Sequence, residues 1–344
     1  MNQEEKRPFF NLQIELNDVC NLICKHCYQI RQKNKEELDI NLILDQLEEF
    51  KAVTGYNKFY FRLSGGEVTL RNDLFRIINK LVLMNQFVEV ITNGTFLDVP
   101  YAYALKATNL NVVQISLDGA TEKTHDFIRG KGAFKKAIKG IKNMVRVGIP
   151  VEIKFTLIKN VNIHEIYEMY QLCSELGVSF LAIGRFIFEG NGKNLEEGNL
   201  IGNELKEVFH NLITYAKDFP YLQIRIRDQL IRIVDKVNEL EVPENINIKQ
   251  KPYMGINYLA FDTYGNVYAD RQLNIVLGNL HKQSLADIWL NSVELNKIRN
   301  TKNNLEGKCL NCNIKDLCLG GNKTASYGLT GNIFAPDPGC WLFE

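Results

Sequence analysis

Along the first 190 residues, short apolar runs alternate with segments whose apolar residues recur at helical spacing. Ile40, Ile43, Leu44 and Leu47, for example, share one face of a helix. Strands are predicted at residues 11–16, 58–63, 87–91, 112–117, 151–158 and 178–187, and helices at 40–53, 73–84, 134–145 and 163–176. This alternation predicts βαβ units and an α/β fold with a parallel sheet, a partial (β/α)6 barrel of the TIM type.

The pattern changes after residue 190. Residues 190–202 are rich in Gly, Asn and Glu, which predicts a linker, and helical and strand-like pieces follow to about residue 244. Two apolar runs at 258–261 and 266–268 predict a β-hairpin, and a short helix is expected at 284–290. We therefore divide the chain into a barrel (1–190), a linker with a helical bridge (191–254) and a loop-rich C-terminal domain (255–344).

Composition narrows the function classes. The chain has 344 residues, 45% of them hydrophobic and 24% charged, and a formal net charge of +1. This charge gives no reason to expect nucleic acid or an anionic membrane surface as a partner. No apolar run is long enough to span a bilayer, and the eight cysteines are clustered. Clustered cysteines without an export signal predict metal binding in a reducing cytoplasm.

A cysteine triplet follows the first predicted strand. Cys20, Cys24 and Cys27 are separated by three and two residues, which places three thiolates on one loop at the spacing of iron–sulfur ligands. Three protein ligands leave one metal position open, as catalytic sites do. Active sites of barrel folds lie at the carboxyl ends of the strands, where this loop is expected. The alternative is a structural zinc knuckle.

This triplet, with His26 between its last two cysteines, resembles the signature of the radical S-adenosylmethionine (SAM) superfamily. The resemblance implies a [4Fe–4S] cluster on the three cysteines and SAM on the open iron. It further implies reductive cleavage of SAM and abstraction of a hydrogen atom from a substrate, with flavodoxin or ferredoxin as electron donor.

Further segments resemble those with which the superfamily binds SAM. Gly65, Gly66 and Glu67 follow the second strand, and two glycines allow close approach of the backbone to a ligand. The resemblance assigns SAM contacts to His26 as an adenine-packing residue, and to Gly65, Gly66, Glu67, Thr92, Asn93, Ser116, Asp118, Arg129 and Arg185. Arg129 is expected to pair with the SAM carboxylate, although both arginines would equally suit surface salt bridges.

A second cysteine set lies near the C-terminus. Cys309, Cys312, Cys318 and Cys340, with the glycines and the Pro-Asp-Pro-Gly segment between them, resemble the SPASM domain of peptide-modifying radical SAM enzymes. Four thiolates close a site, so this auxiliary [4Fe–4S] cluster would be saturated by protein; a zinc ribbon is the alternative.

The SPASM pattern is incomplete in this chain. Such domains usually carry two auxiliary clusters, and the first needs cysteines near residues 251–257, after the hairpin, and shortly past Cys318. This chain has no cysteine at residues 251–257, and Asp270 and Asn322 stand at the other two places. The resemblance therefore implies two clusters in all, one SAM-binding and one auxiliary, with the space of the missing cluster available to substrate.

Asp270 and Arg271 are the candidate catalytic residues. In sulfatase-maturing relatives an Asp acts as base at the position of Arg271, so sulfatase maturation is disfavoured. Cys173 lies on the apolar stripe of a helix and is expected to be a packed thiol. This disfavours an epimerase that needs a spare cysteine as hydrogen donor.

The leading hypothesis is a cytoplasmic radical SAM/SPASM enzyme that modifies a ribosomally synthesised peptide by forming a thioether or carbon–carbon bond. The second is a tetrapyrrole-tailoring enzyme of heme-type biosynthesis. Its polycarboxylate substrate would need a cluster of cations, for which Arg185, Arg225, Arg227 and Arg271 are candidates. A third is a non-enzymatic scaffold that binds zinc.

Overall fold

The computed structural model describes residues 9–29, 36–237, 240–248 and 254–342. In these residues an 11-stranded sheet has the order β11-β10-β9-β1-β2-β3-β4-β5-β6-β7-β8. Neighbouring strands from β9 through β1 to β8 run parallel, and the pairs β9–β10 and β10–β11 are antiparallel. The strands are β1 Phe10–Glu15, β2 Phe59–Ser64, β3 Phe87–Thr92, β4 Val112–Ser116, β5 Val151–Leu157, β6 Phe180–Arg185, β7 Gln223–Ile226, β8 Ile246–Asn247, β9 Tyr258–Phe261, β10 Asn266–Tyr268 and β11 Val276–Asn279.

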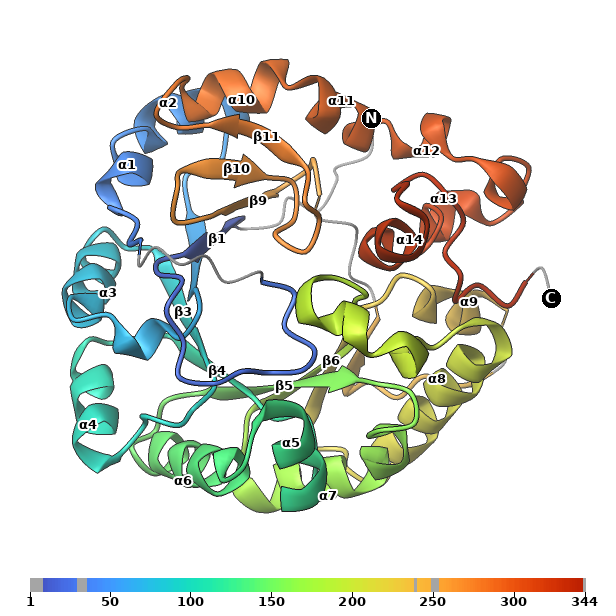
Figure 1. Cartoon of the computed structure of the whole chain (residues 1–344), viewed down its shortest axis with the longest axis horizontal. Coiled ribbons are helices and arrows are strands. Elements are labelled where there is room, and N and C mark those ends of the chain that lie inside the picture. Colours follow the sequence, from blue (N-terminus) through green and yellow to red (C-terminus); the bar gives the residue numbers. More distant parts are fainter. Residues whose placement is uncertain (1–8, 30–35, 238–239, 249–253, 343–344) are drawn as a thin grey trace.

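The helices form an outer ring around the curved sheet (Figure 1). They are α1 Asn41–Leu44, α2 Leu47–Thr54, α3 Leu74–Leu83, α4 Val99–Ala107, α5 Glu122–Arg129, α6 Ala133–Arg146, α7 Ile166–Leu176, α8 Gly202–Ala216, α9 Ile231–Lys236, α10 Leu285–Asn291, α11 Val293–Arg299, α12 Thr301–Asn304, α13 Lys315–Cys318 and α14 Lys323–Thr330. None of the helices in the described ranges is both long and apolar enough to cross a bilayer.

The helices pack on the sheet because the apolar residues along one face of each helix are buried against the apolar strands. In α3 the spaced residues Leu74, Ile77, Ile78 and Leu81 are buried against the sheet, and each such side chain contributes about 1.5–3 kcal/mol on full burial. Cys173 on α7 is fully buried in the same core, which confirms the expectation of a packed thiol.

The α/β fold and all six barrel strands are confirmed, with differences at the helices. The helix predicted over residues 40–53 is two helices, α1 and α2, because the chain turns at Asp45 and Gln46. Helices α4 and α5 were not predicted. The start of α4 is set by the Asp98 cap and a proline in the first turn rather than by an apolar stripe.

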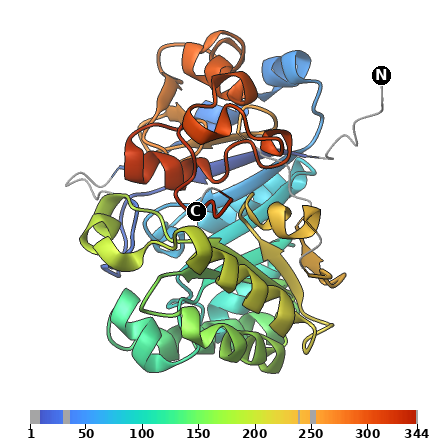
Figure 2. The ribbon, with the colours of Figure 1, turned by 90° about the vertical axis from the view of Figure 1, so that its right-hand side faces the viewer.

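The sheet also extends past the six predicted strands on both sides. Strands β7 and β8 continue it beyond β6. On the other side β9 of the predicted hairpin pairs with β1, so the C-terminal domain begins inside the barrel sheet. The orange and red C-terminal segments lie on the side opposite α5, α6 and α7 in both views (Figures 1 and 2).

Candidate active site

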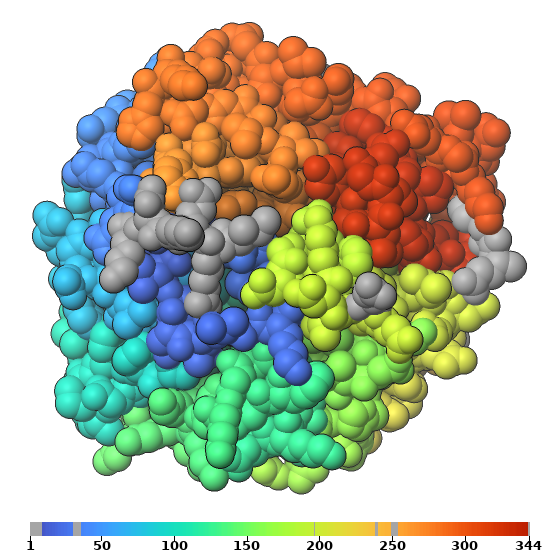
Figure 3. Space-filling model, in the orientation of Figure 1, coloured from blue at the N-terminus to red at the C-terminus, as the bar shows by residue number. Residues whose placement is uncertain are grey.

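A cavity of about 790 Å³ opens at the carboxyl ends of the parallel strands. Its lining includes Cys20, Cys24 and Cys27 at one end and Asn322 and Lys323 of the C-terminal segment at the other. Binding sites for small molecules span about 300–1,000 Å³, so this volume suits a cofactor together with part of a substrate. In Figure 3 the cysteine loop and the yellow-green segment after β6 lie side by side over the barrel. The Asn191 amide there donates to the Cys27 carbonyl at 2.8 Å.

The glycine turn after β2 fixes the start of the cysteine loop. The amides of Gly66 and Glu67 donate to the carbonyls of Asn17 and Val19 at 2.8 and 2.7 Å. A Cβ at Gly66 would lie 2.8 Å from the Asp18 carbonyl oxygen and closer still to Val19. The glycine is therefore required by close backbone packing just before Cys20.

Glu67 ties two strand ends together. Its Oε1 accepts hydrogen bonds from the amide and hydroxyl of Thr69 and from the Thr92 hydroxyl, at 3.1, 2.6 and 2.5 Å. Its Oε2 accepts from the Asn93 amide at 2.8 Å. Each carboxylate oxygen has about two acceptor positions, so Oε2, which accepts one bond here, keeps room for a donor from a ligand. The Asn93 side chain in turn lies 4.0 Å from the Cys20 Sγ.

Asp118 lies at the centre of the polar site. Its Oδ2 is 2.6 Å from the Arg129 Nε and 3.1 Å from the His26 Nε2, and its Oδ1 accepts from the Thr156 amide at 2.9 Å. Burial alone would raise the pKa of Asp118, but Arg129 and His26 outweigh burial and hold it well below its usual range. The Arg129 Nη1 also lies 3.9 Å from the Cys24 Sγ.

The N-terminal site fits a cluster with a bound organic ligand. Its three cysteines form no disulfide and lie on the wall of one cavity, with the Arg129 guanidinium beside Cys24. The His26 Nδ1 is buried without a hydrogen-bond partner in the described residues, which suits a ligand that donates to it.

Every arginine that lines the cavity is paired with an acidic side chain. The pairs are Arg62 with Glu89, Arg129 with Asp118, Arg185 with Asp228 and Asp337, and Arg225 and Arg227 with Glu152. The described residues place no carboxylate within 4.0 Å of Lys154, which projects from β5 toward Gly184 and also lines the cavity. Burial, with Arg227 nearby, lowers the pKa of Lys154 to about 7.

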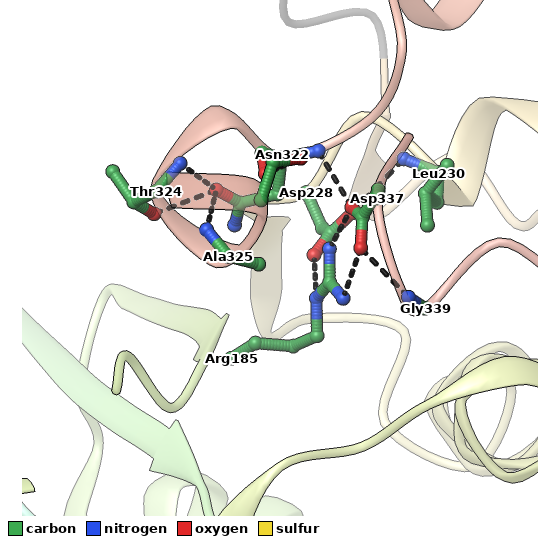
Figure 4. A network of polar contacts seen from close by, with 9 residues as sticks. Arg185, Asp228, Leu230, Asn322, Thr324, Ala325, Asp337 and Gly339 are labelled. Carbon is green, nitrogen blue, oxygen red and sulfur yellow. Dashed lines mark hydrogen bonds and ion pairs between the residues drawn. The ribbon is translucent and has the colours of Figure 1, made fainter. Parts of the chain in front are cut away.

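Arg185 joins the barrel to the C-terminal segment (Figure 4). Its Nε lies 2.5 Å from the Asp228 Oδ2, and its Nη1 and Nη2 lie 3.0 and 2.5 Å from the two oxygens of Asp337. Asp337 also accepts from the amides of Asn322 and Gly339 at 2.7 and 2.8 Å. The guanidinium that the sequence suggested as a SAM contact thus holds two buried aspartates.

The four C-terminal cysteines gather beside a buried lysine. Cys309 and Cys318 are buried, and Cys312 and Cys340 are half-buried. The thiols of Cys309, Cys318 and Cys340 influence one another electrostatically. The Lys323 Nζ beside them is buried and has no hydrogen-bond partner in the described part of the chain.

The C-terminal set also fits an iron–sulfur cluster. Four thiolates are a full ligand set for an iron–sulfur cluster, and they equally suit zinc. The orphaned Lys323 ammonium suits a group with net negative charge.

Asp270 and Arg271 lie in different surroundings. Asp270 lines the cavity, and burial raises the pKa of its carboxyl group. Arg271 pairs with Glu15 of β1 at 2.8 Å and stacks over Tyr268. Glu15 also accepts from Gln29 at 2.6 Å, so this pair anchors the end of the cysteine loop.

Several residues of the site were not singled out from the sequence. Lys154, Asp228, Lys323 and Asp337 were missed. A lysine inside the apolar run of β5 was a usable sign, since a charge there must face the barrel interior. The partners of Arg185 lie 43 and 152 residues away, and no local pattern marks them.

Comparison with known proteins places these residues in context. Residues 14–173 match the Radical SAM superfamily, and residues 253–313 match the iron–sulfur cluster-binding domain SPASM.

Curated relatives match almost the whole chain. The AdoMet-dependent heme synthase of Methanosarcina barkeri is 28% identical over 337 residues, 95% of this chain and 94% of that protein. The mycofactocin maturase MftC of Mycolicibacterium smegmatis is 26% identical over 343 residues, 95% of this chain and 81% of that protein.

Among solved structures, SuiB of Streptococcus suis bound to S-adenosylmethionine has a similar fold. The TM-score is 0.76 at 17% identity, and the match covers 97% of this chain and 77% of SuiB. The same enzyme has also been solved with its precursor peptide SuiA.

Proposed function

Because the chain is a radical SAM protein with a C-terminal SPASM domain, we propose that it cleaves SAM reductively and abstracts a hydrogen atom from a ribosomally synthesised peptide, forming a thioether or carbon–carbon bond. Cys20, Cys24 and Cys27 would hold the SAM-binding [4Fe–4S] cluster, and the other four clustered cysteines an auxiliary one. When bound, the first cluster supplies the electron that splits SAM into methionine and a 5′-deoxyadenosyl radical. Flavodoxin or ferredoxin in a reducing cytoplasm would provide that electron.

The residues around the cysteine loop would bind and orient SAM. Asp118 holds Arg129 and His26 in fixed positions, and Arg129 offers its remaining N–H groups to the SAM carboxylate. The free acceptor position on Glu67 Oε2 suits the SAM ammonium. Thr92, Asn93 and Ser116 complete this wall at the ends of β3 and β4. Arg185 would act through Asp337 by holding the C-terminal segment against the barrel.

The residues that line the cavity are the main support for this proposal. It extends from the cysteine loop to Asn257, Asp270 and Asn322. These are the positions where the SPASM pattern expects ligands of a further auxiliary cluster. With polar side chains in place of cysteines, this part of the cavity would receive the substrate beside SAM.

The charges of the interior favour a peptide over a polycarboxylate. The four candidate cations for a tetrapyrrole, Arg185, Arg225, Arg227 and Arg271, are each paired with an acidic side chain. This pairing reduces the positive charge available to several carboxylates, although Arg225 and Arg227 share the single carboxylate of Glu152. A fold of this kind holds a precursor peptide in SuiB.

A tetrapyrrole is the second candidate substrate, favoured by the relatives. A heme synthase and an Fe-coproporphyrin III synthase of Methanosarcina barkeri match 95% and 94% of the chain. Lys154 lines the cavity without a carboxylate within 4.0 Å in the described residues, and it would suit a propionate group.

The test uses anaerobically reconstituted protein beside a variant with Cys20, Cys24 and Cys27 all changed to alanine. We expect iron and sulfide for two [4Fe–4S] clusters, falling to one in the variant, and SAM cleavage by the parent alone. Mass spectrometry would follow candidate peptides encoded near the gene, with Fe-coproporphyrin III as the competing substrate.

Each outcome of this test decides between the candidates. A peptide that loses two hydrogen atoms while SAM is cleaved would establish the leading proposal. Turnover of the porphyrin alone would replace it with the second. Absence of iron from both sites would refute both enzymatic functions and favour the zinc-binding scaffold.

A further inference from the structure

Lys323 is an unusual buried cation. It is the first residue of α14, and only 8% of its surface is exposed. Its Nζ is fully covered and makes no hydrogen bond within the described residues. Burying an ammonium group without a partner is costly, so the native protein must supply a compensating negative charge.

Carboxylates of the described residues do not compensate this charge. The nearest, Asp337, already accepts from Arg185, Asn322 and Gly339, and its oxygens lie beyond ion-pair distance of the lysine. Asp228 already accepts hydrogen bonds from the Leu230 amide and the Arg185 guanidinium. The groups that remain around the ammonium are the thiols of Cys309 and Cys318.

The Lys323 ammonium can lie close to the cysteines because residue 320 is a glycine and has no side chain. Gly320 has φ +78°, and a Cβ there would lie 2.7 Å from the Lys323 Nζ and 3.9 Å from the Cys309 Sγ. The lysine and the thiol therefore border the same small space. Lys323 is also among the residues that line the active-site cavity.

We propose that the Lys323 ammonium is the resident counter-cation of an iron–sulfur cluster on Cys309, Cys312, Cys318 and Cys340, and that it raises the reduction potential of this cluster. The inference rests on the auxiliary cluster of the proposed function. It assigns a role to a residue of this chain and does not depend on which substrate the enzyme takes.

The physical basis is electrostatic. Reduction adds one negative charge to a cluster that four thiolates already make anionic. A fixed positive charge in a dry environment stabilises the reduced form more than the oxidised form. Removing that charge lowers the potential, and replacing it with another cation preserves the potential.

The test measures the C-terminal cluster alone. All proteins carry alanine at positions 20, 24 and 27, so that one cluster remains in the full chain. Lys323→Met and Lys323→Arg are compared with this parent, and Lys302→Met serves as the control. Lys302 pairs with Asp316 on the surface of the same domain and is 54% exposed. Anaerobic redox titration followed by electron paramagnetic resonance gives each midpoint potential.

We expect a more negative potential in Lys323→Met, and values near the parent in Lys323→Arg and Lys302→Met. Loss of the cluster from Lys323→Met with retention in Lys323→Arg would show the same dependence on charge. Equal potentials in all four proteins would overturn the inference, as would zinc in place of iron at this site. Either failure leaves SAM cleavage by the intact N-terminal site as a separate test of the proposed function.

Discussion

Asp118 has no measurable exposure and is nevertheless held ionised by its neighbours. Arg129, His26 and the Thr156 amide all bond to its two oxygens. The same carboxylate therefore stabilises the barrel interior and fixes the two side chains expected to meet SAM. A single residue here couples stability to the geometry of the site.

We predict that Asp118→Asn lowers the free energy of unfolding by about 3 kcal/mol, because the buried Arg129 guanidinium loses its charged partner. Urea unfolding of the metal-free proteins measures the change. Glu122→Gln is the control, since Glu122 pairs with Lys135 at an exposed position and its loss should cost less than about 0.5 kcal/mol. Equal costs for the two variants would contradict the prediction.

Lys154 makes stability depend on pH. Burial, together with Arg227 and Arg62, lowers the pKa of Lys154 to about 7, while Glu152 and Asp118 act in the opposite direction. Its pKa in the unfolded chain is about 10.4. Between these values the unfolded state binds more protons, so stability rises with pH.

For Lys154→Met we therefore expect a stability advantage over the parent that shrinks as pH rises from 7.5 to 9.5, by at most about 1.4 kcal/mol per pH unit. Urea unfolding at several pH values measures this difference. Lys136→Met, at an exposed position of α6, should show a constant difference. A constant difference for Lys154→Met as well would refute the prediction.

At the scale of elements, the turn before Cys340 is attached to the end of β6 through the Asp337–Arg185 ion pair, which we call the Asp337 clamp. Asp337 is 2% exposed, and its carboxylate accepts hydrogen bonds from the Arg185 guanidinium and from the amides of Asn322 and Gly339. Because the Asn322 amide lies shortly after Cys318 and the Gly339 amide directly before Cys340, the aspartate fixes the path of the chain between these two cysteines.

We predict that Asp337→Asn lowers the free energy of unfolding by about 2 kcal/mol through its weakened bond to the guanidinium. Amide hydrogen exchange should quicken around α14 while β2 to β4 keep their protection. Asp316→Asn, which removes an exposed partner of Lys302, should change neither. Uniform quickening across the barrel would show that the clamp serves the whole fold instead.

At the scale of the whole molecule, the sequence predicted the barrel better than its extensions. Strands β1 to β6 are buried apolar runs ended by turn residues, so each is encoded locally. The pairing of β9 with β1 joins residues 247 positions apart, and nothing local specifies such a register. Short edge strands such as β8, with two residues, contain too few residues to show a recognisable pattern of apolar and polar positions.

The same contrast applies to the site. The N-terminal cysteines, Asn93 and Arg129 could be placed on one cavity because strand ends meet in a barrel. The acidic partners of Arg185 and the isolation of Lys323 could not be predicted, since both depend on how distant segments pack. Which buried cations have an acidic partner can be determined only from the three-dimensional structure.

The position of β1 between β2 and β9 has a consequence for biosynthesis. Strand β1 receives its second neighbour, β9, only when the chain 247 residues further on has been made. Until then its edge is an open template for pairing with other chains. Since the cysteine loop directly follows this strand and residues of the C-terminal segment line the same cavity, the pairing of β1 and the completion of the cavity occur together, late in translation.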